Sequence, residues 1–201
     1  MAQALTDKVL AENLLAGNGA ALRVKQVLLV ILGIAALAVA AKIRVPMWPS
    51  PVPVTMTTFA VLTIGAAYGP RLGLATILGY MTIGALGFDV FASSSAELNG
   101  MNYMLGGTGG YLLGYVLAAL VLGIAARRGL DRSVLGMGAA LLLGNALIYV
   151  PGLLWLNQFT AGWTQTLDWG LIPYLVGDLV KLGLAALLIP AAWKLVGRAR
   201  G

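Results

Sequence analysis

The residues best suited to chemistry in this chain of 201 residues are an aspartate and a lysine three positions apart, Asp178 and Lys181. Both lie inside an apolar stretch that runs from about residue 172 to 196. A separation of three residues on a helix places the two charges on one face. Tyr174 precedes Asp178 by four residues and lies on the same face. An ion within a membrane costs at least ~2.5–3.5 kcal/mol, so the pair is expected to bind something. The carboxylate can accept N–H groups, and the ammonium can donate to a carbonyl or carboxylate.

A structural ion pair that fixes the packing of two helices is the alternative for these charges. We prefer a ligand site, because a neutral hydrogen bond would hold helices together at a lower cost in desolvation. The stretch from residue 134 to 156 adds Asn145 and Tyr149, which are four apart and therefore share a face. An asparagine in a membrane segment needs a partner, which is most often a neighbouring helix.

The longest loop is predicted between about residues 89 and 110, and it contains Asn99 and a run of glycines at 106–110 interrupted by Thr108. Loops of this length are typically lids, binding loops or disordered segments. Consecutive glycines allow backbone N–H groups to approach a ligand closely, although they also make plain tight turns.

The amino-acid composition indicates the class of protein to which these residues belong. Hydrophobic residues make up 60% of the chain and charged residues 10%, against roughly half and a quarter in soluble domains. This excludes a water-soluble enzyme and a disordered chain. With neither Cys nor His, the sequence has no disulfide, no thiol nucleophile and no Cys/His metal site, and we predict no metal or cofactor. The net charge of +6 fits basic residues retained beside a membrane better than nucleic-acid binding.

Six apolar stretches approach the ~20 residues that a helix needs to cross a bilayer. They lie at about 24–41, 54–68, 72–88, 111–126, 134–156 and 172–196. Backbone groups in lipid must be paired internally, so the stretches are helices. The sequence therefore predicts an all-α integral membrane protein, with a polar N-terminal segment at 1–22 and a membrane domain of six helices at 23–201. A cleaved signal peptide at the first stretch is the less favoured alternative.

Charged residues in the loops predict the orientation. If the N-terminus is cytoplasmic, Lys42 and Arg44 are the basic residues outside, and Asp89, Glu97 and Asp168 are also outside. The basic residues on the inside are then Lys8, Arg23, Lys25, Arg71, Arg127, Arg128, Arg132, Lys194, Arg198 and Arg200. This asymmetry places both termini in the cytoplasm.

Several stretches together resemble the BioY family, the biotin-specific substrate-binding components of energy-coupling-factor transporters. The matching stretches are Gly69-Pro70-Arg71-Leu72-Gly73 with residues 80–87, Gly106 to Gly114, Gly144 to Tyr149 with Gly152 and Trp155, and Gly177-Asp178-Leu179-Val180-Lys181. The run Thr108-Gly109-Gly110-Tyr111-Leu112 combined with Asp-x-x-Lys in the last helix is the most specific part.

The resemblance implies a non-enzymatic subunit in a prokaryotic plasma membrane that captures biotin near the outer face. It implies that Asp178 and Lys181 contact the bicyclic head group and that the loop before Tyr111 helps to close the site. Ala36 and Ala40 are expected to dock a transmembrane coupling protein, and two ATPase subunits complete the transporter. The predicted substrate-binding residues are Asp178, Lys181, Tyr174, Asn145, Tyr149, Asn99, Gly109 and Tyr111.

The chemistry of biotin agrees with this set. Its ureido group has two N–H donors and one carbonyl acceptor, which complement a carboxylate and an ammonium. Its apolar ring suits aromatic walls such as Tyr149, Tyr174 or Trp155. Backbone amides at 107–110 are predicted to bind its carboxylate.

Three other functions compete with this prediction. The first is an ion-gradient-coupled carrier that works alone, with Asp178 as the titrating group. The others are an intramembrane enzyme and a structural membrane protein. The sequence contains no Gly-Lys dipeptide and therefore no P-loop. If P-loop hydrolysis of ATP energises uptake, a partner protein must carry it out.

Overall fold

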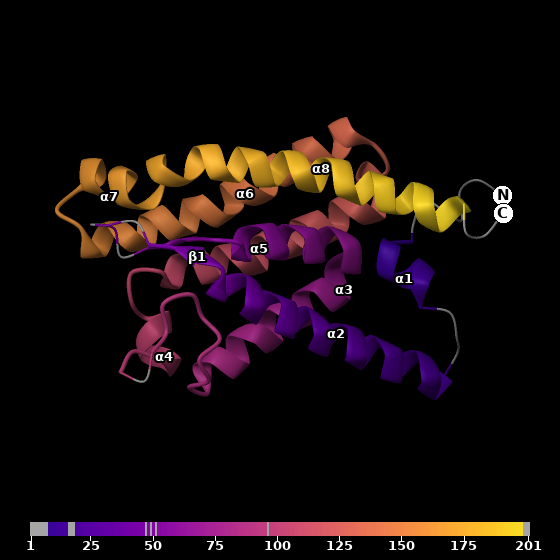
Figure 1. Cartoon of the computed structure of the whole chain (residues 1–201), viewed down its shortest axis with the longest axis horizontal. Helices are drawn as coiled ribbons and strands as arrows, with labels where there is room; N and C mark the ends of the chain where they lie inside the picture. Colours follow the sequence, from indigo (N-terminus) through magenta and orange to yellow (C-terminus); the bar gives the residue numbers. More distant parts are fainter. Residues whose placement is uncertain are drawn as a thin grey trace.

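Long helices make up most of the computed structural model, which describes residues 8–15, 19–46, 48, 50, 52–95 and 97–198 (Figure 1). The elements in chain order are α1 (Leu10–Leu14), α2 (Gly19–Lys42), β1 (Arg44–Val45), β2 (Val54–Thr55), α3 (Thr57–Ala85), α4 (Gly100–Met104), α5 (Gly109–Arg127), η2 (Leu130–Arg132), α6 (Val134–Leu156), η3 (Asn157–Phe159), α7 (Trp163–Gly170), η4 (Ile172–Tyr174) and α8 (Leu175–Arg198).

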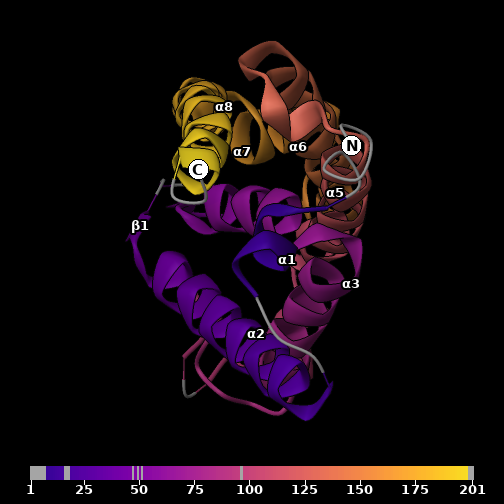
Figure 2. The ribbon, with the colours of Figure 1, turned by 90° about the vertical axis from the view of Figure 1, so that its right-hand side faces the viewer.

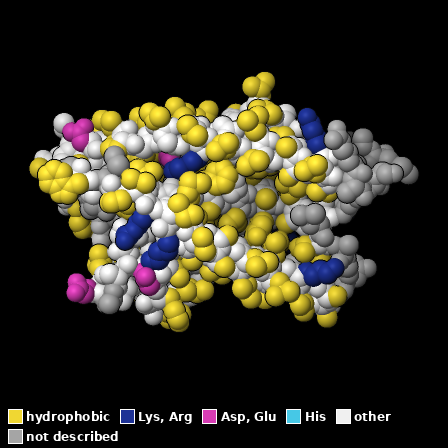
Figure 3. All heavy atoms as spheres, viewed as in Figure 1, with side chains coloured by type: hydrophobic (Ala, Val, Ile, Leu, Met, Phe, Trp, Pro, Cys, Tyr) yellow, Lys and Arg dark blue, Asp and Glu magenta, His cyan; other side chains and the backbone are white. Residues whose placement is uncertain are grey.

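Within the described residues, five helical segments are long and apolar enough to cross a membrane, which confirms the predicted class of helical membrane protein. They are Gly19–Lys42, Thr57–Ala85, Gly109–Arg127, Val134–Phe159 and Trp163–Val196. Hydrophobic side chains cover most of the face seen in Figure 3, and charged ones are few. A helix that is apolar all round is expected where one side meets lipid and the other meets protein.

The predicted second and third membrane helices, 54–68 and 72–88, are joined in α3. Gly69 interrupts this element with a φ of 76° and a ψ of 180°, a conformation that glycine adopts without steric cost, and Pro70 follows it. In Figure 1 the half of α3 before the break and the half after it run in different directions. A methyl group on Gly73 would lie 3.4 Å from the Gly65 Cα, so the two halves meet at small residues.

Helix α5 lies at the centre of the packing, against α3 on one side and α6 on the other, while α8 packs on α6 and α3 (Figure 2). Glycines on α5 bring these helices into backbone contact. A methyl group on Gly114 would lie 2.6 Å from the Ile148 Cα of α6. This close approach is the use that membrane helices make of small residues.

The segment between α2 and α3 has local structure at both of its ends. Its two ends pair as a short antiparallel ladder, with Arg44 opposite Thr55 and Val45 opposite Val54. Trp48 is 95% exposed, as expected for an aromatic side chain that reaches the membrane interface. The ladder fixes where α3 begins and therefore where its first threonines lie.

The predicted polar N-terminal segment contains the short helix α1, and the first long helix begins at Gly19 rather than near residue 24. Val9 is fully buried against Gly69 at the α3 break. Glu12 pairs with Arg127 at the end of α5, with 2.6 Å between the carboxylate and guanidinium atoms. These contacts hold α1 against the same end of the bundle as the ends of α5 and α8.

A buried carboxylate, Asp131, joins the α5–α6 connection to the end of α8. Its Oδ2 accepts the indole N–H of Trp193 at 2.5 Å, and its Oδ1 lies 3.2 Å from the Nε of Arg132. The guanidinium of Arg132 also stacks over the Trp193 ring, 3.5 Å from its centroid. Burial raises the pKa of the Asp131 carboxyl above its ordinary value.

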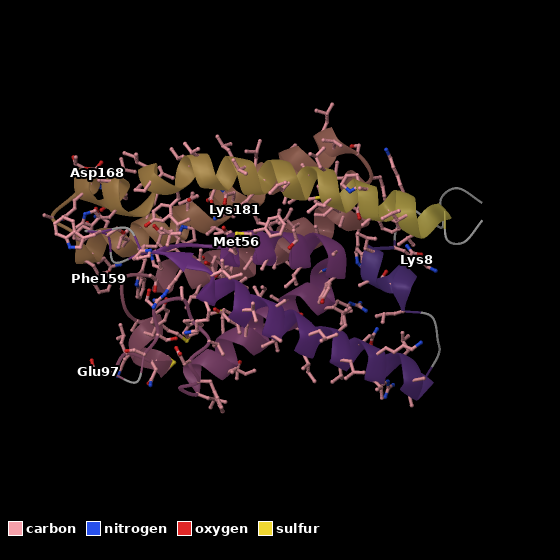
Figure 4. All side chains as sticks on the ribbon, viewed as in Figure 1. Lys8, Met56, Glu97, Phe159, Asp168 and Lys181 are labelled. Carbon is pink, nitrogen blue, oxygen red and sulfur yellow. The ribbon has the colours of Figure 1, made fainter. Side chains whose placement is uncertain are left out.

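The two ends of the bundle differ in charge. Figure 4 shows Asp168 and Glu97 at one end, Lys8 at the other, and Lys181 between them. We refer to the end that carries Asp168 and Glu97 as the acidic end.

Candidate functional site

A cavity lies beside the Asp178–Lys181 pair, and the space free of protein atoms among its lining residues is about 640 Å³ when the adjoining open solvent is included. Its walls come from the ends of elements that meet toward the acidic end. The lining residues are Val52, Pro53, Thr55, Thr57, Thr58, Tyr80, Phe91, Ala92, Tyr103, Thr108, Tyr111, Leu112, Tyr115, Ile148, Tyr149, Gly170, Tyr174, Asp178 and Lys181. A mainly apolar and aromatic wall with a few convergent polar groups is typical of small-molecule sites.

The ion pair forms the polar part of this cavity. The Lys181 Nζ lies 2.9 Å from the Asp178 Oδ1, and the two residues are 9% and 4% exposed. The same ammonium donates to the Thr55 carbonyl at 2.7 Å and to the Thr58 hydroxyl at 3.2 Å. An ammonium has three N–H donors, so all three have partners on the protein.

The Asp178 carboxylate keeps hydrogen-bond acceptor positions that no protein donor occupies. Its Oδ1 accepts from Lys181, and its Oδ2 accepts the hydroxyl of Tyr149 at 2.6 Å. A carboxylate has about four acceptor positions, so about two are left toward the cavity. The site therefore presents a charged acceptor whose counter-ion is held in place by the protein.

Local structure explains why these charges meet. Asp178 lies in the first turn of α8, where a negative charge is favoured by the unpaired N–H groups of the helix. Thr55 lies in β2, directly before α3, and its carbonyl is directed at Lys181. The β1–β2 ladder thus supplies an acceptor that no membrane helix could offer from its interior, where carbonyls are already paired.

Aromatic side chains form the wall nearer the acidic end, and their hydroxyls bind backbone carbonyls. Tyr111 donates to the Gly170 carbonyl at 2.9 Å, which connects α5 to α7. Tyr174 lies 2.9 Å from the Trp169 carbonyl and also contacts the carbonyl of Val52. These bonds fix the aromatic rings in place, so the wall is largely formed before a ligand enters.

The loop after α3 forms another wall. Phe91 is 1% exposed, stacks on Tyr103 with 4.8 Å between ring centroids, and meets the edge of Tyr80 at 5.4 Å. Gly84 makes room for it, because a methyl group there would lie 2.1 Å from the Phe91 ring. All three aromatic residues line the cavity, so the position of this loop determines its shape.

Two basic residues hold this loop against the end of α2. The Lys42 Nζ lies 2.6 Å from the Asp89 Oδ1 and 2.8 Å from the Phe91 carbonyl, and Arg44 donates to the Ala92 carbonyl at 2.6 Å. The bonds from Lys42 and from the Ser94 hydroxyl lower the pKa of the Asp89 carboxyl. The contact is therefore present at neutral pH and is lost only as the pH falls through this lowered pKa.

Comparison with known proteins shows the family of this chain. The family model described as "BioY family" matches residues 12–198, which is most of the chain. The chain belongs to the BioY family. A probable biotin transporter BioY from Pyrococcus horikoshii is 36% identical over 83% of this chain and 95% of its own. The biotin transporter BioY of Thermotoga maritima is 32% identical over 77% of this chain and 87% of its own.

A solved structure shares the fold. The crystal structure of the S-component for biotin from an ECF-type ABC transporter superposes with a TM-score of 0.78, at 19% identity. The match covers 89% of this chain and 95% of that one. This likeness confirms that the BioY chain has the membrane fold of such S-components.

The structure of this BioY protein brings five of the predicted site residues together around the cavity. They are Asp178, Lys181, Tyr174, Tyr149 and Tyr111.

The other three predicted site residues do not line the cavity. Asn145 is 9% exposed, and its Oδ1 has no hydrogen-bond partner among the residues that the structure describes. Asn99 precedes α4, and Gly109 packs against the Met104 carbonyl and Trp155. In place of Gly109, its neighbour Thr108 reaches the cavity.

Trp155, predicted as an aromatic wall, serves a structural role instead. Its indole N–H donates to the Gly106 carbonyl at 2.9 Å, and the residue is not part of the lining. The glycine run thus lies close to α6 because Trp155 binds it. Binding of a ligand carboxylate by amides 107–110 stays a prediction.

Several lining residues of this BioY chain were not predicted as site residues. Thr55 and Thr58 bind Lys181, although threonines in membrane helices usually bond to their own backbone. Tyr115 lines the cavity one turn after Tyr111, and the four-residue spacing of these tyrosines is the signal that could have revealed it.

The predicted docking pair on α2 is divided by the fold. Ala36 lies on the exposed side of the helix, whereas Ala40 is 8% exposed and belongs to the hydrophobic core. The exposed surface of α2 around Ala36 includes Leu32 and Val39, which are 64% and 62% exposed.

Proposed function

We propose that this BioY protein is a membrane-embedded subunit that captures biotin at the outer face of a prokaryotic plasma membrane, for uptake energised by a partner ATPase module. The observation that carries the proposal is the Asp178–Lys181 pair at the wall of an aromatic cavity. The names of the curated relatives, which are biotin transporters, support the choice of ligand. No chemical step is part of the proposal.

The polar groups fit the ligand in a way that refines the expected roles. Asp178 has spare acceptor positions and takes an N–H of the ureido group. Lys181 already has three partners, so its role is to balance the charge of Asp178 and hold it in place rather than to bind the ligand. The apolar ring and chain of biotin then lie along the tyrosine walls.

We also propose six membrane crossings with both termini in the cytoplasm. The break at Gly69 and the contact between Gly65 and Gly73 support two antiparallel crossings within α3. Figure 1 shows α1 and the last turns of α8 at the same end of the bundle, as an even number of crossings requires. The acidic end then faces outside, and the basic excess lies in the cytoplasm.

The partners in this proposal are a transmembrane coupling protein and two ATPase subunits. The chain has no P-loop, so the energy of ATP must come from other subunits. The exposed side of α2 around Ala36 is the surface that we assign to the coupling protein. Small exposed residues allow close approach of a second helix.

Titration of the detergent-purified chain tests the proposed function. We expect saturable binding of one biotin per chain, and no binding of thiamine or riboflavin at the same concentrations, measured by calorimetry. Absence of biotin binding, or equal affinity for the three vitamins, would contradict the proposal. Uptake into proteoliposomes by the chain alone, abolished when an ion gradient is collapsed, would instead support an ion-coupled carrier.

Substitution of Lys42 is predicted to speed the release of biotin. Lys42→Met removes the bonds from the ammonium to Asp89 and to the Phe91 carbonyl, and so loosens one wall of the cavity. Because the pair is 39% and 62% exposed, the effect is modest, about two- to fivefold on the dissociation rate. Chase of a bound fluorescent biotin by excess biotin in a stopped-flow instrument measures it.

Lys194→Met is the control, because Lys194 is an exposed lysine near the far end of α8. Its dissociation rate is expected to equal that of the wild type. Equal rates for all three proteins would show that the loop after α3 does not limit release.

A further inference from the structure

Six tyrosines line the cavity, and their hydroxyls differ in one respect. Five of the hydroxyls bind groups of the protein. Tyr80 donates to the Val90 carbonyl at 3.0 Å, Tyr111 to the Gly170 carbonyl at 2.9 Å and Tyr149 to the Asp178 carboxylate at 2.6 Å. The Tyr174 hydroxyl lies 2.9 Å from the Trp169 carbonyl, and the Tyr103 hydroxyl bonds to Thr108. The sixth is Tyr115. Its hydroxyl has no hydrogen-bond partner among the residues that the structure describes.

Tyr115 lies on the wall of the cavity. It follows Tyr111 by one turn of α5, further from the acidic end where that helix begins. Tyr115 and Asp178 line the same cavity, so one ligand can contact both side chains.

The Tyr115 hydroxyl lies on the cavity wall without a partner among the described residues, so it can donate to a ligand group that accepts from it. The donors of Lys181 are all used, and Asp178 can only accept. A ligand carbonyl beside Asp178 therefore needs a donor other than Lys181, and the Tyr115 hydroxyl on the cavity wall can supply one.

We propose that Tyr115 is a specificity-determining residue, whose hydroxyl donates a hydrogen bond to the ligand carbonyl while Asp178 accepts the adjacent ligand N–H. This inference rests on the proposed function, because it takes the ureido group of biotin as the ligand group. The cavity then selects a neutral head group in which an N–H lies next to a carbonyl.

The test compares wild type and Tyr115→Phe with two ligands. For biotin, we expect a dissociation constant about five- to tenfold higher in the variant, the effect of one hydrogen bond. For 2-iminobiotin, whose protonated group in place of the carbonyl can donate to the phenol oxygen but cannot accept from the hydroxyl, we expect a smaller rise in the dissociation constant. Equal biotin affinity in both proteins would overturn the inference while leaving the proposed function intact; wild type that binds no biotin would instead refute the proposed function.

Thermal melting of the ligand-free proteins separates ligand contact from a structural role. Tyr115→Phe is expected to melt at the wild-type temperature, because no bond within the protein is lost. Tyr111→Phe is the matched control and is expected to melt lower, because it leaves the Gly170 carbonyl without its donor. A Tyr115→Phe protein that fails to fold, or melts as low as the control, would show that its hydroxyl serves the fold, which also overturns the inference.

Discussion

Asp178→Ala is expected to weaken biotin binding by about 10- to 150-fold, the value of a hydrogen bond to a charged group. The carboxylate is the acceptor that faces the cavity, and a methyl group cannot replace it. The variant also leaves Lys181 charged and 9% exposed without its counter-ion. Loss of one partner of a buried pair costs about 3–5 kcal/mol, so the ligand-free protein is expected to melt at a lower temperature.

A double variant distinguishes a binding role from a merely structural ion pair. Asp178→Leu combined with Lys181→Met replaces both charges by apolar side chains of similar size, which is often neutral or stabilising for a buried pair. We expect this protein to melt near the wild-type temperature and still to bind biotin no better than Asp178→Ala. Calorimetry and thermal melting of the three proteins give both quantities.

Asp168→Asn is the control for charge alone, because Asp168 is exposed at the acidic end. It should leave affinity and melting temperature unchanged. Wild-type affinity in either Asp178 variant would remove the assignment of the site, and recovery of binding in the double variant would show that the pair serves packing alone.

Gly123→Ala is expected to destabilise the protein strongly. A methyl group there would lie 2.4 Å from the Pro70 nitrogen and 2.6 Å from the Gly69 carbonyl carbon. These are backbone atoms of the α3 break, so relief requires α3 and α5 to separate. Overpacking of this kind costs about 1–3 kcal/mol, which corresponds to a fall in melting temperature of about 2–12 °C.

Gly183→Ala provides the matched control on α8, since nothing lies within 4 Å of the added methyl group. Its melting temperature is expected to be unchanged or slightly higher, because alanine favours a helix over glycine. The measurement is thermal denaturation of purified protein followed by size-exclusion chromatography. If the two variants melt alike, backbone contact between α5 and the α3 break does not stabilise the bundle.

The sequence was a good guide to whatever depends on residues near each other in the chain. The three-residue spacing of Asp178 and Lys181 requires a shared helix face, and the structure has them in contact on α8. The four-residue spacing from Tyr174 to Asp178 places the tyrosine at the same cavity. Helical periodicity is a local property, so these relations follow from chain geometry alone.

The sequence was a poorer guide to which face of a helix meets the cavity. Asn145 and Tyr149 share a face of α6, yet Tyr149 reaches Asp178 while Asn145 does not line the cavity. Ala36 and Ala40 share a face of α2, yet one is exposed and the other is in the core. Cavities occupy a limited depth along a helix, so a shared face does not imply a shared environment.

What the sequence alone determined, then, is the class of membrane protein, its family and the charged pair at its centre, since these depend on composition and local spacing. Only the tertiary structure decided the partners of that pair: Thr55, which lies 126 residues before Lys181, and Tyr149 from another helix. It also brought Tyr115 to the wall of the same cavity. The physical reason is that lipid and protein interior are both apolar, so hydrophobicity does not show which way a membrane helix turns, and the contacts between helices set it.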